Sequence, residues 1–155
     1  MTLELFISYS TRHEQYAKLL EDELRKWGFT TWIYSIHGDT AKRIKAETTE
    51  KIRRADLVLF LITAKPRRGQ RDEIVAIEKK TNPQQKIFVA SQNRRELVPK
   101  KLNQFPVIDI IPIPTKKSKQ RISCKELLKI IRHIVRSVIQ ETPSGIAEDA
   151  EVPEQ

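Results

Sequence analysis

The fold of this chain is decided by the stretch Leu3-Glu4-Leu5-Phe6-Ile7-Ser8-Tyr9-Ser10 and by the turn that follows it. Leu3 to Ile7 is a short apolar run that favours a β-strand. The next residues, Thr11-Arg12-His13-Glu14, have the pattern of a capping box, in which Thr and Glu side chains bond the open amides of a helix start. The sequence therefore predicts a buried strand that leads directly into a helix. Open α/β sheets bind ligands at such junctions, although a strand and a capped helix without a ligand would have the same pattern.

Composition limits the classes of protein that need to be considered. The 155 residues fit one domain, and a single cysteine excludes an internal disulfide. Three scattered histidines give no metal-binding spacing, no apolar run is long enough to span a membrane, and we expect a cytoplasmic protein. Residues 141–155 hold five acids and no base, so the first 140 residues carry a surplus of 14 positive charges. The bases are dispersed in pairs, which favours a solvated surface over a nucleic-acid interface.

Apolar runs and helical periodicities alternate along the chain. We expect strands over residues 3–7, 29–34, 57–62, 86–90 and 107–110. We expect helices over residues 12–27, from Asp39 to beyond Ile52, over 70–80 and over 123–140, with an acidic, disordered tail over 141–155. The residues between 91 and 105 read as irregular with one short helical turn. This alternation predicts an α/β three-layer sandwich with a five-stranded parallel sheet of order 2-1-3-4-5.

The predicted strand order also nominates a site. In this order the chain turns in opposite directions after strands one and three, so a cleft is expected between their carboxyl ends. That places Ser8-Tyr9-Ser10 beside Thr63, with the loop 35–39 flanking them. Tyr9 and Ser10 are candidate binding residues, although packing at a strand end would also explain them. Asp39 is a candidate ligand, although a role as N-cap of the helix that follows is favoured.

Several of these segments resemble the Toll/interleukin-1 receptor (TIR) domain family. Phe6-Ile7-Ser8-Tyr9-Ser10 is similar to the first signature box of that family, and residues 28–34 resemble its second strand. Residues 52–62 are similar to its second helix and third strand, and Asp72-Glu73-Ile74-Val75-Ala76 resembles the helix start that carries a catalytic glutamate. The resemblance covers residues 3–111 and implies a flavodoxin-like TIR domain over residues 1–140, similar to stand-alone prokaryotic members.

Some members of that family cleave NAD to nicotinamide and ADP-ribose, or to a cyclic product. The resemblance implies that Glu73 is the catalytic carboxylate and NAD the substrate, with no other cofactor. A carboxylate suits this reaction because cleavage of the N-glycosidic bond develops positive charge on the ribose. The bases Arg67 and Arg68 would suit the pyrophosphate. An acid in the first turn of a helix would also be explained by the helix dipole alone.

The chain departs from the enzymatic pattern shortly before the glutamate. Family enzymes often carry a Ser and a Trp six and four residues before the glutamate, where this chain has Arg67 and Gly69. An alternative is therefore a non-catalytic TIR module that acts in immune or defence signalling by self-association or by binding another TIR domain. A further alternative is a basic α/β module that binds nucleotides or nucleic acid. No phosphate-binding glycine loop of either common type is present.

Overall fold

A computed structural model describes residues 2–10, 13–33, 41–63, 68–79, 81–92, 98–111 and 122–140, with the backbone alone for 41–46, 68, 69 and 140. The strands are β1 (Glu4–Ser8), β2 (Thr30–Ile33), β3 (Leu57–Ile62), β4 (Lys86–Gln92) and β5 (Val107–Ile110). The helices are α1 (Glu14–Lys26), α2 (Ala41–Arg54), α3 (Arg68–Ala76) and α4 (Cys124–Gln140), with short 3₁₀ turns η2 (Ile77–Lys79) and η3 (Lys100–Leu102).

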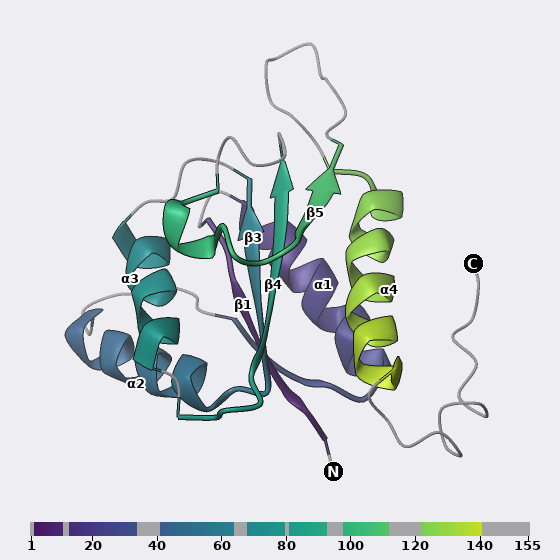
Figure 1. Cartoon of the computed structure of the whole chain (residues 1–155). Helices are drawn as coiled ribbons and strands as arrows, with labels where there is room; N and C mark the ends of the chain where they lie inside the picture. The colour runs from purple at the N-terminus through teal and green to yellow at the C-terminus, as the bar shows by residue number, and fades with distance from the viewer. Residues whose placement is uncertain are drawn as a thin grey trace.

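The five strands form one parallel sheet of order β2-β1-β3-β4-β5, which confirms the predicted α/β sandwich and its strand order. Helices α1 and α4 lie on one face of the sheet, and α2 and α3 lie on the other (Figure 1). The parallel strands all end at the same edge, which we call the carboxyl edge. In this register Ser8 lies opposite Phe60, so β1 ends beside the middle of β3.

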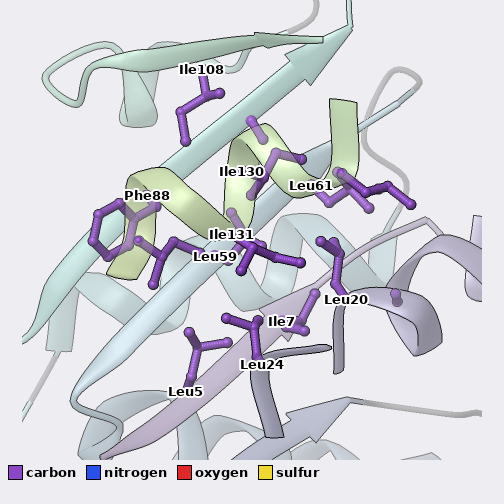
Figure 2. Close-up of a cluster of buried hydrophobic side chains, with 14 of the residues drawn as sticks. Leu5, Ile7, Leu20, Leu24, Leu59, Leu61, Phe88, Ile108, Ile130 and Ile131 are labelled. Atoms are coloured by element: carbon purple, nitrogen blue, oxygen red, sulfur yellow. The ribbon is translucent and has the colours of Figure 1, made fainter. Parts of the chain in front are cut away.

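The face under α1 and α4 holds the larger apolar cluster. Leu5 and Ile7 of β1 point to this face, and so do Leu59 and Leu61 of β3, because every second side chain of a strand lies on the same face of the sheet. Ile130 and Ile131 of α4 cover them, as Figure 2 shows. An apolar stripe of α4 therefore covers this face of the sheet, although Leu128 lies outside the stripe and is 38% exposed.

The face under α2 and α3 is apolar in its interior and polar near the carboxyl edge. Phe6, Phe60 and Val89 form one cluster with Ile52 of α2 and Ile74 of α3. β3 belongs to both clusters and all six of its side chains are buried, as expected for a run without polar residues. This strand is the central strand of the sheet.

Local sequence signals explain some helix ends and not others. α1 ends at Lys26, and Gly28 just beyond it has a φ of 93°, which lets its amide and that of Phe29 bond the carbonyls of Arg25 and Leu24. Ser123 caps α4, because its Oγ accepts a hydrogen bond from the Glu126 amide at 3.3 Å. Thr11 of the predicted capping box lies outside the described residues, and α1 begins at Glu14 after a His13 N-cap that makes no side-chain capping bond.

The His13 amide donates a 2.8 Å hydrogen bond to the Ser10 carbonyl, and α1 begins after this turn. Glu14 is therefore the first residue of α1, whereas the predicted helix over 12–27 has it as the third. β4 also differs from the prediction, because it continues to Gln92 where the sequence indicates an irregular segment. Ser91 and Gln92 pair with β5 residues Asp109 and Ile110, so ladder pairing overrides their polar character. The short helical turn expected before residue 105 is η3.

Candidate functional site

Glu73 lies in the second turn of α3 and points toward the sheet. Because α3 begins at Arg68, Glu73 is too far along the helix for the dipole at its N-terminus to explain an acid there. The Glu73 residue is only 9% exposed. Among the described residues it is the one acidic or basic side chain with so little exposure. A buried carboxyl is costly unless it is paired or neutral, so its position calls for a specific partner.

That partner is Ser8, the last residue of β1. The Ser8 hydroxyl donates a hydrogen bond of 3.0 Å to Glu73 Oε1, and Ser8 is fully buried. Strand alternation places Ser8 on the same face as Phe6, which is the face that α3 covers. The bond joins two segments that lie 65 residues apart in the sequence. It fixes the carboxyl group at the carboxyl end of β1.

Burial sets the charge state of this carboxyl group. Loss of hydration raises the pKa of Glu73 to about 8, while the Ser8 hydrogen bond lowers it and the neighbouring Asp72 raises it. Without a ligand, Glu73 is therefore mainly neutral at pH 7. A cation placed beside it would favour the carboxylate and lower the pKa again. The site can thus gain a negative charge when a positively charged ligand arrives.

A second group of polar residues lies near the same edge, on the α1 side of the sheet. His13 Nδ1 and Thr63 Oγ1 are 2.6 Å apart, so the N-cap of α1 is bonded to the residue that follows β3. Tyr9 is 6% exposed and belongs to the cluster under α1 and α4. Burial raises the pKa of the Tyr9 phenol, and the negative charges of Glu14 and Glu73 add to this effect. Tyr9 therefore stays protonated.

Gln70 occupies the helix position one turn before Glu73. Its Nε2 donates a 3.1 Å hydrogen bond to the Leu61 carbonyl, which ties α3 to the end of β3. The residue is 4% exposed, and among the described residues its buried Oε1 has no hydrogen-bond partner. This bond, together with the one from Ser8, holds α3 against two neighbouring strands.

The structure brings together some of the residues that the sequence nominates. Glu73, Tyr9 and Ser10 all lie at the carboxyl edge, and Ser8 and Thr63 end or follow neighbouring strands as predicted. Ser10 is half-buried, and its carbonyl accepts the His13 amide. Asp39 and Arg67 lie outside the described residues, and for Arg68 only the backbone is described, as the first residue of α3. Their proposed roles stay predictions.

Sequence reasoning missed His13 and Gln70, and it did not pair Ser8 with Glu73. The spacing of Gln70 and Glu73 places them on one helix face and was an available signal. The alternation Phe6, Ser8 was another, because it sets Ser8 on the face opposite Tyr9. What the sequence does not show is which helix covers which face. That information comes from the packing of α3.

Other features lie away from this edge. A groove of about 640 Å³ is lined at the opposite edge by residues such as Asp56 and Lys86. In the part of the chain that the structure describes, no group of three His, Cys, Asp or Glu side chains could hold a metal ion. No helix within the described ranges is long and apolar enough to cross a membrane.

The sequence also matches a family model. The model of the TIR domain matches residues 5–123, which is most of the chain and runs from the second residue of β1 to beyond β5. This chain belongs to the TIR domain family. Among curated proteins, none matches it significantly. Family membership identifies the chain as a TIR protein of the signalling or defence type, and it agrees with the flavodoxin-like strand order of the sheet.

Proposed function

We propose that this TIR protein cleaves NAD between nicotinamide and ribose, with Glu73 as the catalytic residue. The observation that carries the proposal is the Ser8–Glu73 hydrogen bond, which holds a buried carboxyl group at the carboxyl edge. Parallel α/β sheets bind their ligands at this edge. The family resemblance of residues 72–76 adds that NAD-cleaving members carry their glutamate at this place.

Cleavage of NAD suits a carboxyl group that loses its proton when the substrate binds. The nicotinamide ring of NAD is positively charged, and it would favour the carboxylate form of a group whose pKa is about 8. As water attacks the anomeric carbon, a C–O bond forms and the C–N bond breaks. The electron pair of the C–N bond passes to the ring nitrogen, so nicotinamide leaves neutral, and the proton of the water passes to solvent or to Glu73. The carboxylate stabilises the charge that develops on the ribose.

NAD consumption and nicotinamide release, measured at high protein concentration, test this proposal. Glu73→Gln keeps the size of the side chain and removes its charge. Glu78→Gln is a matched control, because Glu78 is an exposed acid in η2 that pairs with Lys101 at 3.0 Å. We expect turnover by the wild type and by Glu78→Gln, and a loss of about a hundredfold or more in Glu73→Gln. Absence of wild-type turnover at every concentration, or full activity of Glu73→Gln, would refute the proposal.

Assembly is the second candidate function. Strands β2 and β5 are the two edge strands of the sheet, and an exposed apolar residue lies in or next to each of them. Trp32 on β2 is 37% exposed beneath the Lys51 ammonium, and Ile111 after β5 is 61% exposed. Exposed apolar groups on sheet sides favour contacts between chains. Sedimentation velocity over a range of concentrations checks this, and a monomer throughout that range would argue against assembly by the chain alone.

A further inference from the structure

We propose that Ser8 is a positioning residue, whose hydroxyl holds Oε1 of Glu73 so that Oε2 is the oxygen presented to the substrate. This inference rests on the proposed function of Glu73, and it adds a role for a residue of β1. The hydrogen bond of 3.0 Å is the geometric basis. Both residues are buried, so water does not compete with the bond, and its effect on the carboxyl group is larger than at a surface.

The side chains next to Ser8 on the neighbouring strands offer Oε1 of Glu73 no other hydrogen-bond partner. In the row of side chains that includes Ser8, the neighbours on β3 and β4 are Phe60 and Val89, which offer no polar atom. Within the described part of the chain, Oε2 accepts no hydrogen bond. In the neutral acid the proton therefore lies on Oε2, because Oε1 already accepts from Ser8. Oε2 is the atom that loses its proton when the carboxylate forms.

A comparison with Ser91 shows that the bond is not a general property of buried serines here. Ser91 is also fully buried, and alternation along β4 places it on the same face of the sheet as Ser8. Its hydroxyl donates to the backbone carbonyl of the next residue, Gln92, at 2.9 Å. A buried serine can thus bond its own strand. Ser8 instead bonds a carboxyl group on α3.

Two other groups interact electrostatically with Glu73. Asp72 on α3 acts on Glu73, and Glu73 in turn acts on Tyr9 after β1, whose side chain lies on the opposite face of the sheet. Neither is changed by a substitution at Ser8, so the comparison below isolates the hydrogen bond. Because this bond favours the carboxylate, its loss should make Glu73 harder to ionise.

The test is a titration of Glu73 in the ligand-free protein, followed by carboxyl ¹³C NMR. The Glu73 resonance is the one that disappears in Glu73→Gln. We expect the midpoint to move to higher pH in Ser8→Ala and to stay at the wild-type value in Ser91→Ala, the matched control. In Ser8→Cys the midpoint should lie between those of wild type and Ser8→Ala, since a thiol is a weak donor of similar size. Ser8→Cys also replaces Ser8→Ala in the test if Ser8→Ala does not fold. Equal midpoints in wild type, Ser8→Ala and Ser8→Cys would overturn the proposal.

Activity gives a second, separate result. In Ser8→Ala we expect kcat for NAD cleavage at neutral pH to fall by about 10- to 100-fold, with little change in KM and partial recovery at alkaline pH. A structural role alone would leave the shape of the pH profile unchanged, and that result would contradict the inference. A wild-type protein without turnover would refute the proposed function. The NMR titration would then decide by itself whether Ser8 controls Glu73.

Discussion

The two faces of the sheet bury side chains of different kinds. Under α1 and α4 the contacts are made by aliphatic and aromatic groups, of which Ile130 and Leu59 have no exposed surface. Under α2 and α3 the same kind of packing around Phe60 gives way near the carboxyl edge to the Ser8–Glu73 pair. The α1/α4 face therefore contributes mainly to stability. The α2/α3 face carries a group that is costly to bury, which is typical of a functional site.

The largest change in stability is expected on the α1/α4 face. Ile130→Ala removes a fully buried side chain from the interface of α4 with the sheet. The free energy of unfolding should fall by about 2–5 kcal/mol, because a cavity remains where the side chain was. Urea denaturation measures this loss. A change below about 1 kcal/mol would contradict the division between the two faces, because it would show that α4 is loosely packed.

The α2/α3 face should give stability an unusual dependence on pH. The folded pKa of Glu73, about 8, lies above its ordinary value of 4.5. Between these two values the folded state keeps a proton that the unfolded state has released. The contribution of Glu73 to stability is therefore highest below this window and falls as pH rises through it, by on the order of 1 kcal/mol per pH unit.

Urea denaturation at several pH values compares wild type with Glu73→Gln, which cannot ionise. The variant should lose the part of the pH dependence that comes from Glu73 and become more stable than wild type above pH 8. Glu78→Gln, the exposed control, should keep the wild-type dependence. Identical dependences of stability on pH for wild type and Glu73→Gln would show that burial does not raise the pKa of Glu73.

A smaller effect is expected at the start of α4. Ser123→Ala removes the hydrogen bond that its Oγ accepts from the Glu126 amide at 3.3 Å. The free energy of unfolding should fall by about 1 kcal/mol, the usual effect of losing an N-cap. The pKa of Glu73 should not change, because the cap lies on the other side of the sheet. A shift in the Glu73 titration would show that the two faces are coupled.

Much of the fold could be predicted from the sequence, because the strongest patterns coincide with the most buried elements. The run at residues 57–62 is β3 with the predicted bounds, and the alternation of elements predicts the strand order. The ends of elements were less predictable. α1 begins at Glu14, two residues later than predicted, and polar Ser91 and Gln92 lie in β4 because β5 pairs with them.

The site was predictable in location and less so in contacts. Adjacent ends of β1 and β3 follow from the strand order, and Glu73 was nominated by resemblance. The bond between Ser8 and Glu73 depends on the rotation of α3 about its axis, which one polar residue in a helix does not determine. The burial that raises the pKa of Glu73 depends on the packing of α3 against other elements, such as β1 with Ser8. Such effects appear only when the elements are packed.

The most direct test of the central claim is the pH dependence of kcat/KM for NAD cleavage between pH 5.5 and 9.5. The claim is that Glu73, buried and bonded to Ser8, provides the negative charge that the reaction needs. We predict that kcat/KM rises with pH and levels off above about 8, as Glu73 ionises in the free enzyme. Glu73→Gln should show no such rise. A wild-type profile that is flat across this range, or that Glu73→Gln reproduces, would contradict the claim.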